Sequence, residues 1–250
     1  MIGNRNILAV CTARADSKGL PGKNYKPLLG KPLIIWSVMA AFRCKYIDQV
    51  FVSTNCPHVK EIVSQYIGAH KDESWMHGLH GPKVIVVDRP DELATPTSKN
   101  EEALMHSVQM YEDKFGNSPD IIVNLQPTSP IRNDHLLDRC IEAMDDAECD
   151  SLLTVNRHTP FFWRIVNNEP KAFYDPQNRP MRQDIKDEEW MFHDNGNVYA
   201  MTLECLTEHL CRIGKNPYLY ETSPYQSLQI DTDFDFCLIE RMAEVYGSLI

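Results

Sequence analysis

The chain has 250 residues, which suits one domain of ordinary enzyme size with a full core and argues against a second large domain. Its 25 Lys and Arg residues stand against 35 Asp and Glu residues, and the formal charge of -10 argues against general binding to nucleic acid or to an anionic membrane. The sequence has neither a secretory signal nor an apolar run of membrane-spanning length, so we expect a cytoplasmic protein, or a nuclear one in a eukaryote.

Apolar runs alternate with amphipathic helical stretches along most of the chain. The pattern predicts strands at 7–11, 49–54, 83–87, 121–125, 151–155 and 197–201, and helices at 33–42, 57–68, 98–111, 134–144 and 234–246. This order is typical of a mainly parallel sheet with helices on both faces, so we expect a three-layer, Rossmann-like α/β fold. The most apolar run, 121–125, is expected to be the central strand.

The alternation stops between residues 156 and 194, where Pro, Asn, aromatic and charged residues predominate. Phe161, Phe162 and Trp163 form an apolar group within this irregular segment, which suggests a surface that something covers. A small satellite core packed on the main sheet is the alternative, and residue pattern alone does not choose between the two.

The eight cysteines are scattered, without a Cys-x-x-Cys pair and without a His at zinc-site spacing. In a chain of this length with no export signal, reduced and mostly buried thiols are favoured over a disulfide framework. His70, His77 and His80 cluster in a segment with Gly and Trp residues, where a surface loop is favoured over a metal site.

The loop at 13–24 lies between the first predicted strand and the first predicted helix. Arg14, Lys18 and Lys23 place three cations within ten positions, and two glycines permit turns that other residues resist. Cations and free backbone N–H groups together bind anions, so a phosphate site is favoured over a solvated basic loop. The spacing fits neither a Walker loop nor a dinucleotide fingerprint, which leaves a nucleoside-triphosphate loop of another type.

The series Ala-Arg-x-x-Ser-Lys-Gly-x-Pro-x-Lys-Asn at 13–24 resembles the signature of the acylneuraminate cytidylyltransferases. Arg-Pro-x-Glu-Leu-Ala at 89–94 and Leu-Gln-Pro-Thr-Ser-Pro-x-Arg at 125–132 extend the resemblance. Enzymes of this family transfer CMP from CTP to the anomeric hydroxyl of sialic acid or a related nonulosonic acid and release pyrophosphate. The resemblance therefore implies a nucleotidyltransferase that uses CTP, a nonulosonic acid and Mg²⁺.

The resemblance also implies how the chain is organised. Residues 1–250 would form a single cytidylyltransferase domain. Within it, residues 156–194 would form a small extension through which two subunits embrace and complete each other's sugar pocket. We therefore expect a homodimer that binds neither nucleic acid nor a membrane.

Site residues follow from the same resemblance. The nucleotide would be bound by Arg14, Ser17, Lys18, Asn24, Arg89 and Asn100. The sugar acid would be bound by Gln126, Arg182, Gln183, His193 and Asn195. The residues expected to act in catalysis are Lys18, Lys23, Gln126 and Asp231. The cations would offset charge on the triphosphate, and the amide would orient the sugar.

Two parts of the nucleotide site have alternatives. From its neighbours alone, Arg89 could pair with Asp88 or Glu92 instead of a phosphate. Residues 95–100 depart from the Ser-Asp-x-x-Ser-Ser pattern common in relatives, and Asn100 is the substitute expected near the cytosine.

Two sugar-side residues also have alternatives. The Pro-flanked turn that begins at Gln126 could be purely structural, although the resemblance makes Gln126 a substrate contact. Arg182 can clamp the carboxylate of an α-keto acid in bidentate fashion, or it can bond to its acidic neighbours. His193 stands where some relatives have Arg, which suggests a different acyl sugar or a rearranged contact.

Asp231, Asp233 and Asp235 alternate at a predicted strand-to-helix junction. They could bind a hard divalent ion, or they could cap the helix and match its dipole. The resemblance puts Asp231 on Mg²⁺, with Asp233 and Asp235 as weaker candidates. The second ligand stays open because Gln229 stands where relatives with paired aspartates have the first of them.

Two other functions compete with this one. The first is another sugar nucleotidyltransferase of the same fold, such as the 3-deoxy-manno-octulosonate enzymes, which carry an Asp metal ligand near the 125–132 motif. This chain has no carboxylate between Asn124 and Arg132. The second is a non-catalytic sugar-nucleotide-binding protein. The identity of the nonulosonic acid is also open.

Overall fold

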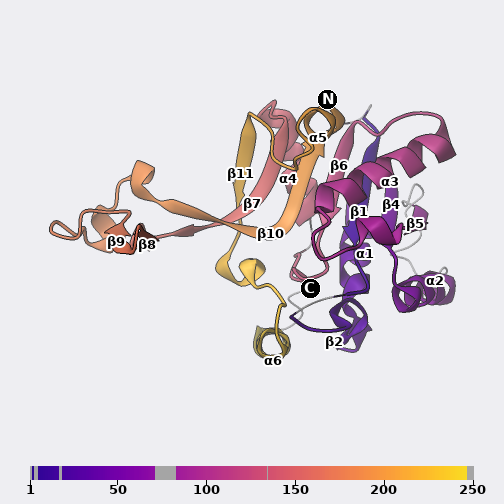
Figure 1. The fold of residues 1–250 in the computed structure, drawn as a ribbon, viewed down its shortest axis with the longest axis horizontal. Coiled ribbons are helices and arrows are strands. Elements are labelled where there is room, and N and C mark those ends of the chain that lie inside the picture. Colours follow the sequence, from indigo (N-terminus) through magenta and orange to yellow (C-terminus); the bar gives the residue numbers. More distant parts are fainter. Residues whose placement is uncertain (1, 3–4, 17–18, 71–82, 134, 247–250) are drawn as a thin grey trace.

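The structure, a computed structural model, describes residues 2, 5–16, 19–70, 83–133 and 135–246. Its main sheet has seven strands in the order β11-β7-β10-β6-β1-β4-β5 (Figure 1). These strands are β1 Ile7–Thr12, β4 Gln49–Thr54, β5 Lys83–Asp88, β6 Ile121–Leu125, β7 Ser151–His158, β10 Met191–Thr202 and β11 Pro217–Glu221. All pairings are parallel except those of β10, which is antiparallel to both β6 and β7. The predicted mainly parallel sheet, with 121–125 at its centre, is confirmed.

Helices cover both faces of this sheet. The described helices are α1 Leu33–Arg43, α2 Pro57–His70, α3 Asn100–Phe115, α4 Leu136–Asp146, α5 Leu203–His209 and α6 Asp233–Tyr246. Successive side chains of β1 point to opposite faces, as in any strand. Ile7, Ala9 and Cys11 enter the core that α1, α2, α4 and α6 cover, whereas Leu8 and Val10 enter the core beneath α3 and α5. The expected three layers are therefore present.

Some helices begin or end at other residues than predicted, and several short elements were not predicted. The helix predicted at 98–111 begins at Asn100, and it ends after Phe115 because Gly116 adopts a left-handed conformation with φ 74°. Sequence reasoning missed α5, β11 and a short hairpin of β2 Pro27–Leu28 and β3 Lys31–Pro32. These elements are short, and their partners are distant in sequence or their turns are tight.

Residues 156–194 form an arm. β7 and β10 run beyond the sheet as a two-stranded ribbon, and a hairpin of β8 Trp163–Val166 and β9 Glu169–Ala172 lies at its far end (Figure 1). Phe161 packs edge-on against Tyr174 at 5.2 Å, and the Arg179 guanidinium lies 4.0 Å from the centre of the Phe161 ring. The arm therefore has a small aromatic cluster of its own, and the alternative of a satellite core packed on the main sheet is wrong.

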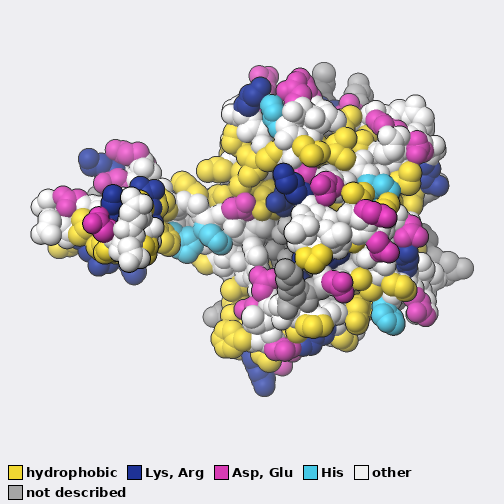
Figure 2. All heavy atoms as spheres, viewed as in Figure 1, with side chains coloured by type: hydrophobic (Ala, Val, Ile, Leu, Met, Phe, Trp, Pro, Cys, Tyr) yellow, Lys and Arg dark blue, Asp and Glu magenta, His cyan; other side chains and the backbone are white. Residues whose placement is uncertain are grey.

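Much of the arm's apolar surface faces solvent. Exposed large apolar side chains on the arm are Phe162, Trp163, Ile165, Phe173, Met181 and Phe192. In Figure 2 the arm shows apolar side chains next to basic and acidic ones, on a projection that is narrow compared with the body. A surface of this kind is typical of one that another protein surface covers.

All eight cysteines lie in the described residues as free thiols, six of them buried, with Cys211 half-buried and Cys237 exposed. Burial raises the pKa of the Cys11 thiol to about 12 despite the nearby Arg132 cation, so this thiol stays protonated. His77 and His80, with the side chain of His70, lie outside the described residues. Within the described part of the chain, no helix combines the length and the apolar character needed to cross a membrane.

Candidate active site

A pocket of about 350 Å³ opens where β1, β5 and β6 end, at the edge where parallel sheets of this kind bind ligands. Four segments line it, namely the loops after these three strands and the segment before α6. The lining residues are Thr12, Arg14, Asp16, Lys23, Asn24, Arg89, Leu93, Thr95, Ser98, Lys99, Asn100, Gln126, Pro127, Thr128, Gln229 and Asp231. Seven residues expected at the site therefore share one cavity.

The loop after β1 is tied to itself and to the loop after β5. Asn24 is buried and donates from Nδ2 to the Arg14 carbonyl at 2.9 Å. Arg14 donates from Nη1 to the Thr95 carbonyl at 3.1 Å. Ser17 and Lys18 lie outside the described residues. The expected basic loop thus borders the pocket.

Lys23 connects this loop to the segment before α6. Its Nζ lies 2.9 Å from Asp231 Oδ1 and donates to the Ile230 carbonyl at 3.2 Å. The two chain segments approach so closely that a Cβ on Gly19 would lie 2.6 Å from the Asp231 carbonyl oxygen, so only glycine fits there. A cation and a carboxylate expected in catalysis, 208 positions apart, therefore meet in the pocket.

Arg89 is a buried cation. Its guanidinium donates to Ser53, from Nε to Oγ at 3.0 Å and from Nη2 to the carbonyl oxygen at 2.6 Å. Within the described residues it has no ion pair, and Asp88 pairs with Lys60 instead. Burial and, to a smaller extent, the Arg14 charge together lower the pKa of Arg89 to about 10. An anion bound in the pocket would offset both effects.

Asn100 is the first residue of α3, and its side chain is held by a hydrogen bond to strand β6. Its Nδ2 donates to Asn124 Oδ1 at 2.7 Å, and Asn124 in turn donates to the Val10 carbonyl at 3.2 Å. Asn124 was missed by sequence reasoning, although an Asn inside so apolar a strand is itself a signal. The preceding loop is held by Ser98, whose Oγ accepts from the Thr95 backbone N–H at 3.0 Å.

The Pro-flanked turn has a structural role and also borders the pocket, whereas a contact of Gln126 with substrate stays a prediction. The Gln126 carbonyl accepts from the Ser129 backbone N–H at 3.1 Å, which makes the turn, and the Gln126 side chain lines the pocket. The turn is braced by buried Arg132, which donates to the carbonyls of Gln126 at 2.9 Å and Asn197 at 2.8 Å, and to Ser37 Oγ at 3.0 Å. Burial lowers the pKa of Arg132 to about 10. Sequence reasoning gave Arg132 no role, because its partners are mostly distant in the chain.

The three alternating aspartates differ in their partners and positions. Asp235 Oδ2 accepts from the backbone N–H groups of Asp231 at 3.0 Å and Thr232 at 2.8 Å, and from the Thr232 hydroxyl, so it caps α6. Burial raises the pKa of Asp235, but these hydrogen bonds outweigh it and the net pKa is lowered. Asp233 pairs with Lys26. Asp231 alone of the three lines the pocket.

The pocket offers carboxylate oxygens that suit a hard cation, Asp231 and Asp16. The described residues contain no group of three or more His, Cys, Asp or Glu side chains arranged to hold a metal. Mg²⁺ is usually held by one or two carboxylates together with substrate phosphates. The residues present therefore fit a magnesium ion that a triphosphate helps to hold, and Asp231 as its ligand stays a prediction.

The expected sugar-side residues are not all brought together in one chain. Arg182 and Gln183 are exposed on the arm, and neither lines the pocket. His193 is also on the ribbon, where its Nδ1 lies 3.3 Å from Asn156 Oδ1. Asn195 is buried at the base of the ribbon and donates from Nδ2 to Thr222 Oγ1 at 2.8 Å.

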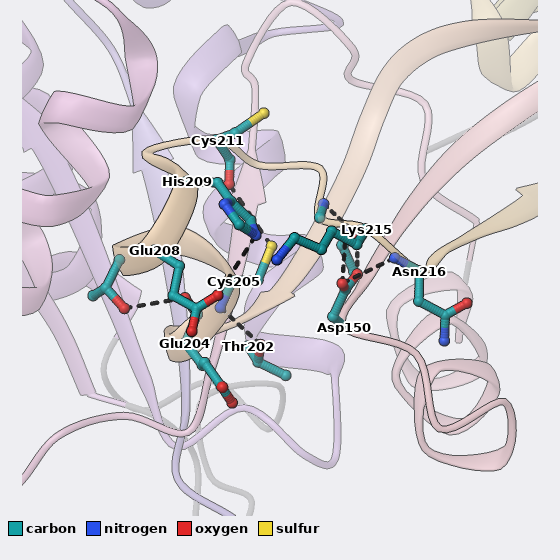
Figure 3. Close-up of polar contacts among 12 residues, drawn as sticks. Asp150, Thr202, Glu204, Cys205, Glu208, His209, Cys211, Lys215 and Asn216 are labelled. Carbon is teal, nitrogen blue, oxygen red and sulfur yellow. Dashed lines mark hydrogen bonds and ion pairs between the residues drawn. The ribbon is translucent and has the colours of Figure 1, made fainter.

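A second polar cluster surrounds Asp150, and none of its residues lines the pocket (Figure 3). Asp150 Oδ2 accepts from the backbone N–H groups of Lys215 at 2.7 Å and Asn216 at 2.9 Å. Burial raises the pKa of Asp150, but these bonds and one from Ser151 outweigh it, so the net pKa is lowered. The cluster fastens the connection between α5 and β11 to the start of β7 and is structural.

Comparisons with known proteins find similar sequences and a similar fold. Residues 8–71 match the family model described as cytidylyltransferase. The N-acylneuraminate cytidylyltransferase of Oncorhynchus mykiss is 30% identical over 250 residues, which cover 97% of this chain and 51% of that protein. The CMP-N,N'-diacetyllegionaminic acid synthase of Legionella pneumophila is 29% identical over 258 residues, which cover 96% of this chain and 97% of that protein.

The solved structure of CMP:2-keto-3-deoxy-manno-octonic acid synthetase complexed with CTP has the same fold. Its TM-score is 0.64 at 19% identity, with 96% of this chain and 99% of that one covered. The fold is thus that of the cytidylyltransferase class of α/β nucleotidyltransferases.

In sequence, the chain is similar over nearly its whole length to acylneuraminate cytidylyltransferases, so the resemblance seen in the 13–24 motif is confirmed. The chain spans about half the length of the fish relatives, 52% of one of the Danio rerio proteins for example.

Proposed function

We propose that this protein transfers CMP from CTP to the anomeric hydroxyl of a nonulosonic sugar acid and releases pyrophosphate. The observation that carries the proposal is the contact between Lys23 and Asp231 in a pocket that Arg14 and Arg89 also border. Clustered cations suit a triphosphate, and a carboxylate among them suits the metal ion that accompanies it. The names of the similar proteins support CTP and a sugar acid as the substrates.

The chain's own residues would act mainly by positioning and by charge. Arg14, Lys23 and Arg89 would offset charge on the triphosphate, and Asn100 would contact the cytosine. Gln126 would orient the sugar so that its anomeric hydroxyl attacks the α-phosphate in line. Mg²⁺ held by Asp231 would stabilise negative charge on the phosphate oxygens and lower the pKa of the attacking hydroxyl.

A homodimer is part of this proposal. Arg182 and Gln183 lie on the arm and His193 lies near the base of its ribbon, and all three are exposed and outside the pocket of their own chain. On a second copy they could approach the sugar side of the pocket and supply the cation that a sugar carboxylate requires. The exposed apolar side chains of the arm, together with Tyr218 and Leu219 on edge strand β11, would be covered in such a dimer. The cytoplasmic location stays a prediction.

Pyrophosphate release tests the proposal. Purified protein is incubated with Mg²⁺, each of the four nucleoside triphosphates, and a panel of sialic, legionaminic, pseudaminic and deaminated acids, with 3-deoxy-manno-octulosonate as the competing substrate. We expect release with CTP and at least one nonulosonic acid. Release only with 3-deoxy-manno-octulosonate or another sugar would favour the second nucleotidyltransferase function. CTP binding without release from any acid would favour a non-catalytic binding protein.

A further inference from the structure

A bulge at the base of the arm contains a glycine next to the pocket. The pairing of β10 with β7 shifts register between Asp194 and Tyr199, and Gly196 within the bulge has φ +64°, a conformation that favours glycine. Asp194 fastens the bulge, because its carboxylate accepts from the Gly196 backbone N–H at 3.1 Å and from the Tyr199 hydroxyl at 2.8 Å.

Two glutamine amides meet above this glycine. A Cβ on Gly196 would lie 2.9 Å from Gln229 Nε2 and 3.0 Å from Gln126 Oε1. Gln229 is held there, since its Nε2 donates to the Asn195 carbonyl at 2.6 Å. Both glutamines line the pocket. Their present positions therefore depend on the missing side chain at 196.

This wall of the pocket differs in chemistry from the others. The loops after β1 and β5 supply cations, whereas the wall next to the bulge carries the amides of Gln126 and Gln229, with the Thr128 hydroxyl two residues after Gln126. Uncharged amides and a hydroxyl both donate and accept hydrogen bonds, which suits a polyhydroxylated ligand better than a phosphate. An ionised aspartate at 229 would have no N–H to donate to the Asn195 carbonyl, so the hydrogen bond seen in this chain depends on the amide of Gln229.

We propose that Gln229 is a positioning residue for the sugar acid and that Gly196 determines how much room the sugar has. Gln229 joins the base of the arm to the pocket wall, and Gly196 lets the amides of Gln126 and Gln229 share that wall. The inference rests on the proposed function, because it assigns this wall to the sugar acid and the cationic walls to CTP.

A double-mutant cycle tests the inference. Initial rates of pyrophosphate release are measured for wild type, Gly196→Ala, Gln229→Ala and the double variant, with either substrate varied while the other is saturating. Each single change should raise KM for the sugar acid about tenfold and leave KM for CTP within about twofold. The double variant should lose less than the product of the single effects, because removal of the Gln229 side chain frees space for the new methyl group.

Two further variants separate positioning from mere stability. Gly116→Ala places alanine at a second left-handed glycine, φ +74°, which has no neighbouring atom within 4 Å of the built Cβ, so it reproduces the backbone strain alone. It should lower the melting temperature without changing either KM. Gln229→Glu keeps the size of the side chain but, when ionised, removes the donor to Asn195, and it should match Gln229→Ala in KM for the sugar acid.

Three results would count against the inference. Equal rises in both KM values, strictly multiplicative effects in the cycle, or a Gly116→Ala variant with the same KM change would each overturn it. A wild-type protein that releases no pyrophosphate with any acid would overturn the proposed function, and the sugar-side assignment with it. If the wild type is active but the variants raise both KM values equally, the inference alone is overturned and the proposed function stands.

Discussion

Asp231→Asn should separate activity from stability. The substitution keeps the size of the side chain and removes its charge. If Asp231 holds the metal ion beside the triphosphate, turnover at ordinary Mg²⁺ should fall steeply, while the protein should unfold at nearly the wild-type temperature. The structure supports this separation, because Asp231 lines the pocket and the capping of α6 is done by Asp235.

The size of each effect follows from the contacts. Asp231 has 66% of its side chain exposed, and among the described residues it forms one ion pair, with Lys23. An ion pair this exposed contributes about 0.2–1 kcal/mol, so the melting temperature should fall by no more than about 4 °C. A charge-assisted contact in the transition state is worth about 1.5–3 kcal/mol, which corresponds to a loss of turnover of roughly 10- to 150-fold.

Asp235→Asn is the matched control four residues away. It removes charge from the carboxylate that accepts three hydrogen bonds at the start of α6, so it should destabilise by about 1 kcal/mol and change turnover little. The assays are steady-state pyrophosphate release and thermal unfolding by circular dichroism. An Asp231→Asn protein with wild-type turnover beside an inactive Asp235→Asn or Asp233→Asn protein would show that the metal ligand has been assigned to the wrong aspartate.

Three further predictions concern the pocket and its supports. Lys23→Ala and Lys18→Ala should each lower the rate at least roughly tenfold with the fold intact, and near-wild-type turnover of both at saturating CTP would remove the basic loop from the site. Arg132→Met leaves the carbonyls of Gln126 and Asn197 without this donor, so urea unfolding should show a loss of about 2–4 kcal/mol; an unchanged midpoint would contradict the bracing role. Folding lowers the pKa of Asp235, so the ionised carboxylate should stabilise the fold above its unfolded pKa of about 3.9 and lose that contribution as pH falls through its folded pKa. Asp235→Asn should therefore reduce the loss of stability between neutral and acid pH. An unchanged loss of stability at acid pH would contradict this role of Asp235.

The sheet and the basic loop were predictable because their signals are local. A buried strand is a short run of apolar residues, and an anion-binding loop is a run of cations and glycines just after it. Asn24, Arg89 and Asn100 were expected at the nucleotide site by resemblance, and the structure places all three along one pocket.

The sequence predicted the arm only as an interruption in the alternation of apolar runs and amphipathic helical stretches. Its ribbon forms because β7 and β10 go on pairing with each other beyond the other strands of the sheet, for example Phe192 with Arg157 and Met191 with His158. Those residues have no apolar alternation, since no core covers the ribbon on either side. Pairing between segments about 35 residues apart leaves no local signal in composition, so the length and direction of the arm could not be read from the residues.

The supports of the site were missed for a related reason. Arg132 and Gly196 act through atoms of residues that are mostly distant in the sequence, a hydroxyl and backbone carbonyls for Arg132 and two amides for Gly196. A single sequence gives a cation in a turn and a glycine in a strand, and neither indicates a partner. The cations of the basic loop were predictable from local chemistry and the other candidate site residues from the family resemblance, whereas the residues that hold them in place required the tertiary structure.

The position of Arg182 leads to a last prediction, which concerns two chains at once. Arg182 lies on the arm, and Asp231 lies in the pocket. If the arm of one subunit completes the partner's pocket, Arg182→Ala and Asp231→Asn each inactivate a homodimer, but a mixed dimer keeps one intact site. That site combines the unaltered pocket of one chain with the unaltered arm of the other. After equal mixing and subunit exchange, half of the dimers are mixed, so activity should recover to about a quarter of wild type. If the arm serves only its own chain, no mixed dimer contains an intact site and the mixture stays inactive. A monomeric wild-type protein with full activity in sedimentation would exclude the shared site altogether, and fully active Arg182→Ala would remove Arg182 from the sugar pocket.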